Sequence, residues 1–289
     1  MKTDIIGEYE NSNDQIKIVG NEDLMRFTSI ASGSSGNCTY IGSDNTHILI
    51  DAGVSKKRIE EGLNGLDLTL SDIDAIFVTH EHVDHIAALH TILKKFDIPI
   101  YATNGTIKGI RSSDKKSEMI NSQFIPVQVD REVAVGDMIL NPMTISHDAN
   151  EPCGYRVYCD GKKIGVATDL GCYTDYTVDC LRGCDALLLE ANHDVRMLQT
   201  GPYPYQLKRR ILGDMGHLSN EKSGELLCKL LHDNIKGIFL GHLSKENNLP
   251  ELAFETVRVE VEMGDNPYHG NDFRIMVAER SELSPVLSF

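Results

Sequence analysis

Three histidines and two acidic residues lie within six consecutive positions, directly after an apolar run, in the stretch "AIFVTHEHVDHIAAL". They are His80, Glu81, His82, Asp84 and His85. Neutral imidazole and carboxylate groups are ligands that suit zinc, iron or manganese. His80 and His82 alternate along the chain, so both can reach one ion, whereas Asp84 and His85 open a helix and can reach a second. This spacing rarely arises from core packing or surface decoration, and it predicts a metal site.

Six apolar runs end in a residue that can bind a metal ion or carry a proton. These residues are Asp51, His80, His147, Asp169, Glu190 and His242. If the carboxyl ends of the strands lie at one edge of a sheet, the residues gather where α/β folds place ligands. Polar residues that merely follow strands into loops would explain the acids, but they explain three histidine tips poorly in a chain with 11 histidines. His147, Asp169 and His242 are therefore the predicted source of the remaining ligands.

The elements that position these residues begin at Met25, where short runs rich in Val, Ile, Leu and Thr start to alternate with amphipathic stretches. The patterns predict strands at 25–31, 37–42, 46–50, 74–79, 98–102, 124–129, 137–145, 154–159, 163–168, 185–190, 236–241 and 272–279. They predict helices at 55–63, 85–96, 104–111, 174–182, 204–214, 219–232 and 250–263. Ser219 is the expected N-cap of the helix at 219–232, with Lys222 at its third position.

The sequence shows neither a fixed repeat nor a linker rich in Pro, Gly or Ser. We therefore expect one domain over 25–289, with many strands covered by helices, and a polar extension at 1–24. Hydrophobic residues make up 41% of the 289 residues and charged residues 25%, which is typical of a globular protein. Apolar runs are too short to span a membrane and no signal-peptide pattern opens the chain, so no membrane partner is expected.

Seven cysteines are present, and none lies in a Cys-x-x-Cys pair. This pattern favours a reducing cytoplasm over a disulfide framework. Cys172, Cys180 and Cys184 could form a small zinc site, although buried reduced thiols are the more common arrangement.

The formal net charge of −15 argues mildly against a nucleic-acid partner, because phosphate binding normally needs a basic face. A local basic patch can survive such an excess of acid. Two stretches are candidates: Lys208, Arg209 and Arg210 in "QLKRRIL", and Arg111, Lys115 and Lys116 in "RSSDKK". Each is more often an ordinary solvated face.

The motifs, taken in order, resemble those of the metallo-β-lactamase fold superfamily from about Met25 to the C-terminus. They are "LIDAG" with Asp51, "THEHVDH", His147, "ATDLG" with Asp169, and "LGHLS" with His242. The resemblance implies an α/β (α+β) fold, a four-layer αββα sandwich, with a dinuclear site along its edge. It implies two divalent transition-metal ions, zinc or manganese, with iron also possible. It implies that His80, His82 and His147 hold one ion, Asp84, His85 and His242 the other, that Asp169 bridges them, and that Asp51 orients a ligand.

Further motifs resemble the YycJ/WalJ branch of that superfamily, whose members are cytoplasmic hydrolases with exonuclease activity on DNA. They are "ASGSSGNCTYIG", "LEANHD", "GHLSN" and "GHLSKENN". The resemblance implies a nucleic-acid substrate, with DNA favoured. The loop that contains Ser34, Ser35 and Asn37 offers N–H groups and hydroxyls to an anion, or it forms a tight turn.

Two ions roughly 3.5–4 Å apart can hold a bridging hydroxide that attacks phosphorus. Asp84 would orient this hydroxide and take its proton. By similarity to the tRNA 3′-processing nucleases of the superfamily, His217 would protonate the leaving oxygen and Glu190 would orient His217. His193 is the competing candidate for the leaving-group role.

Other functions remain open. A glyoxalase II-like thioesterase, or another small-molecule ester hydrolase, keeps the same metal ligands, although the extra pair of Glu190 and His217 favours phosphodiesters. A typical dizinc β-lactamase is disfavoured because Asp169 stands where that class has a cysteine. A flavin-diiron oxidoreductase is disfavoured because the second motif histidine is retained and no flavin domain fits. A non-catalytic metal-binding module would not need Asp84. The sequence leaves the oligomeric state open.

Overall fold

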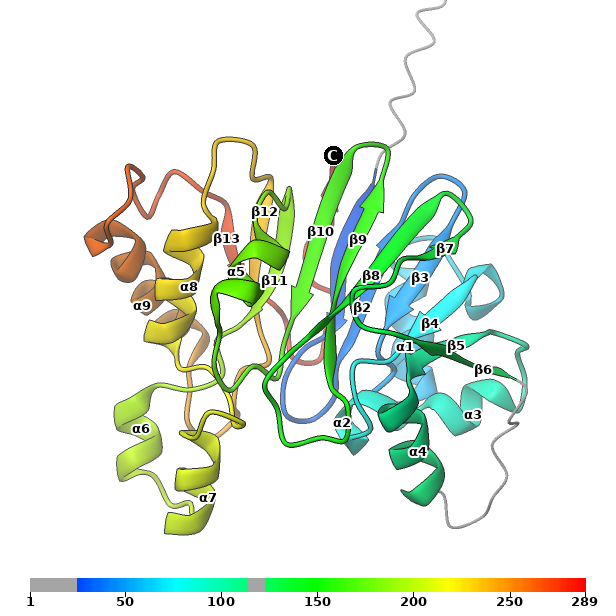
Figure 1. The fold of residues 1–289 in the computed structure, drawn as a ribbon, viewed down its shortest axis with the longest axis horizontal. Helices are drawn as coiled ribbons and strands as arrows, with labels where there is room; N and C mark the ends of the chain where they lie inside the picture. Colours follow the sequence, from blue (N-terminus) through cyan, green and yellow to red (C-terminus); the bar gives the residue numbers. More distant parts are fainter. Residues whose placement is uncertain (1–24, 114–122) are drawn as a thin grey trace, which may run out of the picture.

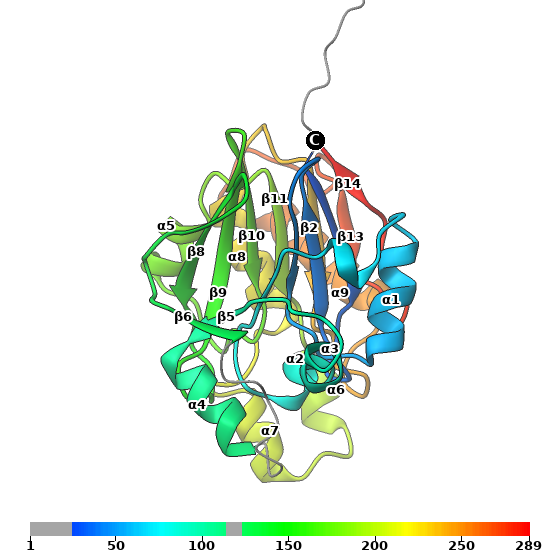
Figure 2. The ribbon, with the colours of Figure 1, turned by 90° about the vertical axis from the view of Figure 1, so that its right-hand side faces the viewer.

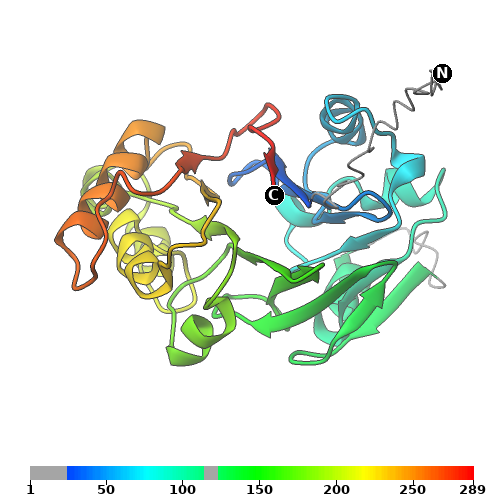
Figure 3. The same cartoon turned by 90° about the horizontal axis from the view of Figure 1, so that it is seen from above.

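Two seven-stranded sheets pack face to face, and helices cover the outer face of each (Figure 1, Figure 3). The structure is a computed structural model that describes residues 25–113 and 123–289. The predicted extension at 1–24 and the candidate cations Lys115 and Lys116 lie outside the described residues. The predicted four-layer αββα sandwich is confirmed.

The first sheet has the order β14-β1-β2-β3-β4-β5-β6, in which β3 to β6 run parallel. Its strands are β1 (Arg26–Ala31), β2 (Cys38–Gly42), β3 (His47–Ile50), β4 (Ala75–Phe77), β5 (Ile100–Thr103), β6 (Phe124–Val127) and β14 (Leu287–Ser288). The helices beside it are α1 (Lys56–Asn64), α2 (Val83–Ile86), α3 (Leu89–Leu93) and α4 (Asn104–Ser113), together with the 3₁₀ turn η1 (Leu70–Asp72) (Figure 2).

The second sheet has the order β13-β12-β11-β10-β9-β8-β7, in which β10 to β13 run parallel. Its strands are β7 (Val133–Val135), β8 (Met138–Thr144), β9 (Cys153–Cys159), β10 (Lys162–Ala167), β11 (Ala186–Glu190), β12 (Gly237–Gly241) and β13 (Ile275–Val277). The helices beside it are α5 (Asp175–Leu181), α8 (Asn220–Leu230) and α9 (Pro250–Met263). Two short helices, α6 (Val195–Thr200) and α7 (Tyr205–Ile211), project from the lower end of this half (Figure 1).

Aromatic side chains join the two sheets in the middle of the sandwich. Phe27 of β1 meets Phe239 of β12 edge-on, with ring centroids 5.5 Å apart. Phe77 of β4 meets Tyr155 of β9 in the same way at 5.4 Å. Such edge-to-face pairs add stability to the area that the rings bury. This central core fixes the position of one sheet on the other, and with it the distance between the loops that carry the predicted ligands.

The helix predicted at 85–96 is wrong as a single helix, because the chain forms α2 and α3 instead. The carbonyl of His85 accepts from the N–H of Ala52, and the N–H of Ala88 donates to the carbonyl of Ala52, at 2.9 and 2.8 Å. The segment after β3 therefore takes backbone groups that a continuous helix would pair internally. This exchange binds the histidine-rich turn to the end of β3.

Other boundaries differ in smaller ways. The helix predicted at 204–214 ends at Ile211, and the patterns missed α6, β7 and β14. The predicted start of α8 is confirmed, since the hydroxyl of Ser219 accepts from the N–H of Lys222 at 3.3 Å. Among the described residues, none of the helices is both long and apolar enough to cross a membrane.

Candidate active site

The ends of β3, β4, β8, β10, β11 and β12 bring the six predicted strand-tip residues to one rim of the sandwich. β3 and β4 are parallel, as are β10, β11 and β12, so their carboxyl ends lie together as expected. Asp51, Asp169 and His242 each adopt positive φ angles, of 64°, 59° and 56°. This left-handed conformation is uncommon for residues other than glycine and concentrates at functional sites.

The histidine-rich turn packs against the "LIDAG" segment with no room between the two backbones. A Cβ atom on Gly53 would lie 1.7 Å from the carbonyl oxygen of Asp84. That same oxygen accepts from the N–H of Asn37, whose own carbonyl accepts from the N–H of Gly53, each at 2.8 Å. Only glycine fits this close approach. The turn therefore owes its position to two other segments of the chain, at Asn37 and at Gly53.

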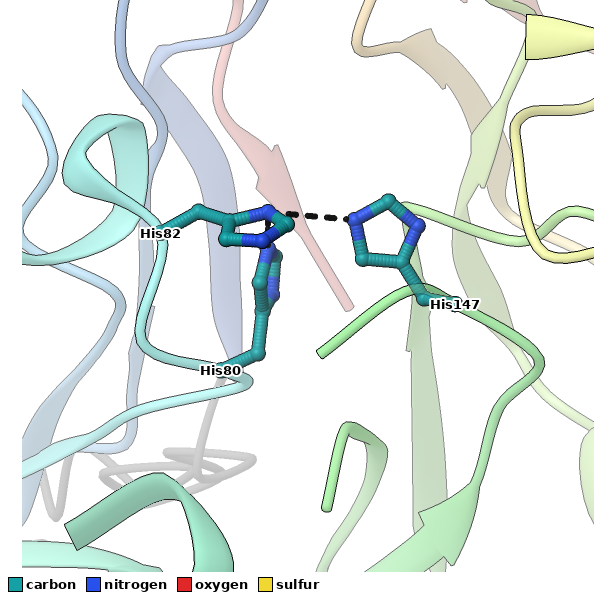
Figure 4. A group of neighbouring side chains, drawn as sticks. All are labelled: His80, His82 and His147. Atoms are coloured by element: carbon teal, nitrogen blue, oxygen red, sulfur yellow. Dashed lines mark hydrogen bonds between the residues drawn. The ribbon is translucent and has the colours of Figure 1, made fainter. Parts of the chain in front are cut away.

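Three of the predicted ligands converge from both halves of the sandwich (Figure 4). Nδ1 of His82 lies 3.1 Å from Nε2 of His80 and 3.3 Å from Nε2 of His147. Burial, reinforced by the neighbouring histidines, lowers the pKa of His80 well below its ordinary value. The ring is therefore neutral, which is the form that binds a metal ion.

A second group of predicted ligands lies beside the first. Nε2 of His242 lies 3.5 Å from Oδ2 of Asp84 and 3.4 Å from Oδ1 of Asp169. Nε2 of His85 lies 3.7 Å from Oδ2 of Asp84 and 3.3 Å from Oδ2 of Asp169. Asp169 also reaches the first group, since its Oδ1 lies 3.8 Å from Nε2 of His147. This central carboxylate thus lies beside members of both groups.

The chemistry of this cluster fits a bound cation. Oδ2 of Asp169 and Nε2 of His242 are buried and have no hydrogen-bond partner, whereas buried polar atoms are normally paired. Burial alone would lower the pKa of His85, but Asp169 and Asp51 outweigh it and raise this pKa to about 9. The surplus of buried negative charge that these contacts reveal is what divalent ions would neutralise.

Asp51 contacts the ring of His85 directly, at 2.7 Å between its Oδ2 and Nδ1. Thr79 holds this carboxylate through its N–H and its hydroxyl, and the hydroxyl also lies 3.0 Å from Nδ1 of His80. Such outer contacts fix ring orientation and tautomer. The sequence patterns missed Thr79, although its place directly before His80 was the available signal.

Glu190 brings together two histidines from different loops. Its Oε1 lies 2.8 Å from Nδ1 of His217 and 2.8 Å from Nδ1 of His242. Its Oε2 accepts from the N–H groups of Leu170 and Leu218. Burial would raise the pKa of Glu190, but His217 and His242 outweigh it and hold the pKa below its usual range. Glu190 thus contacts His217, as its proposed role requires, and also contacts His242, which the sequence patterns did not indicate.

His217 stands beside the predicted ligands rather than apart from them. Its ring centroid lies 5.1 Å from that of His147 and 5.2 Å from that of His242. The side chain is 20% exposed, so the ring reaches both the cluster and solvent. Asp169, Glu190, His217 and His242 also form a group that could itself hold an ion, which the sequence patterns did not indicate.

Two further residues near the cluster escaped the patterns. Asp148 follows His147 directly, and its Oδ1 lies 3.5 Å from Nε2 of that histidine. Its other oxygen accepts from Nε of Arg210. Asn192 donates to the carbonyl of His242 at 2.8 Å and so supports the strained backbone there.

The remaining predicted site residues border the cluster, and Nδ2 of Asn37 lies 3.1 Å from Nε2 of His85. Asn37 closes the glycine-serine turn, because its side chain accepts from the N–H of Gly33 and donates to the carbonyl of Gly33. Ser34 and Ser35 are exposed on that turn, and binding of an anion by them stays a prediction. His193 is buried beside His217 in the wall of a pocket.

The basic stretch on α7 is not a row of three free cations. The Lys208 ammonium donates to the carbonyls of Gln199 and Gly201, at 2.7 Å each. Arg210 pairs with Asp148. Arg209 lies over the ring of Tyr205, 6.0 Å from its centroid. Arg111, from the other predicted stretch, is exposed at the end of α4.

The cysteines follow the more common of the two expected arrangements. None of the seven forms a disulfide, and Cys180 and Cys184 are buried, whereas Cys172 is half-buried. Burial raises the pKa of Cys184 to about 12, so this thiol stays protonated. In the described part of the chain, the candidate metal groups are built from histidine and carboxylate side chains and include none of the cysteines.

Comparison with known proteins agrees with this geometry. The family model described as beta-lactamase superfamily domain matches residues 46–235, which carry all of the predicted metal ligands except His242. The chain belongs to the beta-lactamase superfamily.

Within this superfamily, the chain is similar to two curated exodeoxyribonucleases. WalJ of Streptococcus pneumoniae serotype 2 (strain D39) is 36% identical over 262 residues, which cover 91% of this chain and 97% of that protein. YycJ of Bacillus anthracis is 37% identical over 229 residues, which cover 79% of this chain and 86% of that protein. The resemblance to the YycJ/WalJ branch of the beta-lactamase superfamily is confirmed.

A solved structure of the beta-lactamase superfamily shows the same fold. The metallo-beta-lactamase fold protein YhfI from Bacillus subtilis superposes with a TM-score of 0.66, covering 93% of this chain and 100% of that chain. The two sequences are 16% identical.

Proposed function

We propose that this protein is a metal-dependent phosphodiesterase that hydrolyses nucleic acid from its ends, with DNA as the favoured substrate. The observation that carries the proposal is the contact between Glu190 and His217, which lies directly beside the histidine and aspartate cluster. Hydrolysis of a phosphodiester expels an alcohol, and its basic leaving oxygen needs a proton donor. The similarity to two proteins named exodeoxyribonucleases supports the same substrate class.

The residues that would hold two divalent ions form two groups joined by one carboxylate. We assign His80, His82 and His147 to one ion, Asp84, His85 and His242 to the other, and Asp169 to both. Zinc or manganese suits this donor set, and iron is also possible. When bound, two such ions supply Lewis acidity toward a phosphoryl oxygen and lower the pKa of water toward neutrality.

Asp84 is the proposed proton acceptor for the attacking water. Its side chain is 27% exposed, so water can reach a carboxylate that also touches His85 and His242. Burial alone would raise the pKa of Asp84, but the contact with His242 and the charge of His85 outweigh it and lower the pKa. The group is therefore ionised at neutral pH, which is the form that can accept a proton.

His217 is the proposed proton donor to the leaving oxygen. Because Nδ1 of the ring is held by Glu190, Nε2 is the nitrogen left to exchange a proton with substrate. The carboxylate fixes the orientation and the tautomer of the ring, as an acid does in other catalytic pairs with histidine. Hydrolysis of a thioester expels a thiolate, which needs no such proton. A glyoxalase II-like thioesterase would therefore not need the pair of Glu190 and His217.

Two further features belong to the proposal. Tyr205 is 73% exposed on α7 and lies beneath Arg209. An aromatic face next to a cation suits stacking with a base of a single strand. We also propose a reducing compartment, the cytoplasm, because none of the seven cysteines forms a disulfide.

The test is a side-by-side assay of metal-loaded protein on end-labelled DNA, RNA of the same sequence, an activated nitrophenyl phosphodiester and a thioester. We expect both nucleic acids and the nitrophenyl diester to turn over, DNA faster than RNA, and the thioester to turn over slowly or not at all. An Asp84→Asn sample purified in parallel shows whether a contaminating nuclease contributes. Much faster turnover of the thioester than of any phosphodiester would contradict the proposal.

A further inference from the structure

A pocket of about 510 Å³ has His217 in its wall. Its walls come from the loops after β10, β11 and α7 and from the first turn of α8. Tyr173, Val195 and Leu212 supply apolar surface, and His193 and His217 supply imidazole rings. This volume lies in the range of pockets that enclose a small organic group.

His193 is an unsatisfied polar side chain in this wall. It is 1% exposed, and neither of its ring nitrogens has a hydrogen-bond partner. Its backbone is fixed, because its carbonyl accepts from the N–H of Asn220 at 2.9 Å. A buried donor and a buried acceptor without partners are costly to the fold, so the ring is retained at a stability cost that a ligand would relieve.

The character of the pocket suits an uncharged ligand with polar edges. Burial lowers the pKa of His193 to about 4, so at neutral pH the ring offers one donor and one acceptor. Lys222 lies in the wall, but its ammonium is paired with Glu225 at 2.6 Å. A phosphate would therefore find little free positive charge here. A nucleobase has a flat apolar face for Tyr173 and Leu212, and donors and acceptors along its edge.

We propose that this pocket binds the base of the nucleotide that carries the leaving oxygen, with His193 as its hydrogen-bond partner. The inference rests on the proposed function, in which His217 serves that same oxygen. Because His217 forms part of the pocket wall, an oxygen placed at its Nε2 holds the attached nucleoside at the pocket entrance. The pocket would then position a chain end for hydrolysis, which small diesters without a base cannot exploit.

A two-by-two comparison tests this inference. Wild-type protein and His193→Ala each digest a DNA oligonucleotide with all of its bases and one whose leaving nucleotide is abasic. Loss of one neutral hydrogen bond predicts roughly a tenfold fall in kcat/KM for the variant on the complete DNA. The kcat/KM of wild-type protein should be at least tenfold lower on the abasic DNA than on the complete DNA. On the abasic DNA, the kcat/KM of the variant should equal that of wild-type protein. Equal loss by the variant on both substrates would overturn the inference.

Two more variants test whether the preference for the complete DNA depends on the pocket itself. Leu212 is 44% exposed at the pocket, so Leu212→Trp fills the space without disturbing the core and should lower the preference for the complete DNA. His269→Ala changes an exposed histidine that contacts Glu262 and should leave the preference unchanged. If Leu212→Trp keeps the full wild-type preference, the base does not bind in this pocket.

A direct binding measurement separates this inference from the proposed function. A deoxynucleoside 5′-monophosphate should bind wild-type protein about tenfold more tightly than deoxyribose 5-phosphate, and His193→Ala should lose that difference. Equal binding of the two ligands by wild-type protein would overturn the inference even if phosphodiesters are hydrolysed. Absence of any phosphodiester turnover would instead overturn the proposed function.

Discussion

Glu190 and His217 lie 27 residues apart in the sequence, and their side chains meet at 2.8 Å between Oε1 and Nδ1. The same oxygen lies 2.8 Å from Nδ1 of His242, a predicted metal ligand. One buried carboxylate thus orients both the proposed proton donor and a proposed ligand. This shared contact means that the leaving-group chemistry and metal binding are not independent.

Replacing Glu190 by Gln should therefore affect metal content as well as turnover. Loss of an outer contact to a ligand typically costs 10–100-fold in metal affinity or activity. We expect Glu190→Gln to lose metal during dialysis more readily than wild-type protein, while His217→Ala retains its metal. Elemental analysis of the dialysed samples measures this difference. Full metal retention by Glu190→Gln would show that Glu190 does not support His242.

His217→Ala should be most harmful when the leaving group is poor. A natural DNA diester has a basic alcohol as its leaving group. The variant should hydrolyse it ~10²–10⁴-fold more slowly than wild-type protein does, which is the range of general acid catalysis. The nitrophenolate of an activated nitrophenyl diester leaves without a proton, so the variant should hydrolyse this diester at nearly the wild-type rate. Measurements of kcat on both substrates decide the matter, and an equal loss on both would assign His217 to binding instead.

Asp84→Asn tests the proposed proton acceptor. The amide cannot take a proton from water, so kcat should fall ~10²–10⁴-fold. We expect most of the metal to stay bound, because five histidines and Asp169 remain within the two proposed groups. Metal content and kcat are measured on the same sample. An unchanged kcat in a metal-replete sample would remove Asp84 from the mechanism.

His193 should make the metal-free protein sensitive to acid. Its folded-state pKa of about 4 lies below the ordinary value of 6.5, so between these values the unfolded chain binds more protons. Stability therefore falls as the pH drops below 6.5. The free energy of unfolding of both proteins should decrease between pH 7 and pH 5. For His193→Phe this decrease should be smaller than for wild-type protein, by up to about 2 kcal/mol. Urea titrations at both values test this, and His269→Ala should behave like wild-type protein.

Much of the site was predictable because it lies at the ends of parallel strands. Asp51, His80 and His242 follow apolar runs whose type is clear from composition, and parallel strands necessarily bring such ends together. The two-sheet fold was implied by the resemblance of the motifs to those of the superfamily. The order of the strands in each sheet was not predictable, since pairing depends on contacts between distant residues.

Contacts between loops escaped prediction for a related reason. The second partner of Glu190, the bond pattern of Ala52 that divides α2 from α3, and the buried place of His193 all depend on tertiary packing. Local patterns carry no signal for such packing. They named the basic stretch on α7 as a candidate patch, but they did not show that Lys208 and Arg210 have separate local partners. The short helix α6 lacked a periodic apolar face long enough to detect.

The most direct test of a two-ion DNA-end hydrolase is a metal titration read out by activity. Metal-free protein is loaded stepwise with zinc or manganese, and each sample is divided between elemental analysis and digestion of end-labelled DNA. Activity should be negligible without metal and should reach its maximum at about two ions per chain. Full activity at one ion per chain would contradict the proposed dinuclear mechanism. So would digestion of DNA by the metal-free wild-type protein, provided that a metal-free Asp84→Asn sample does not digest it.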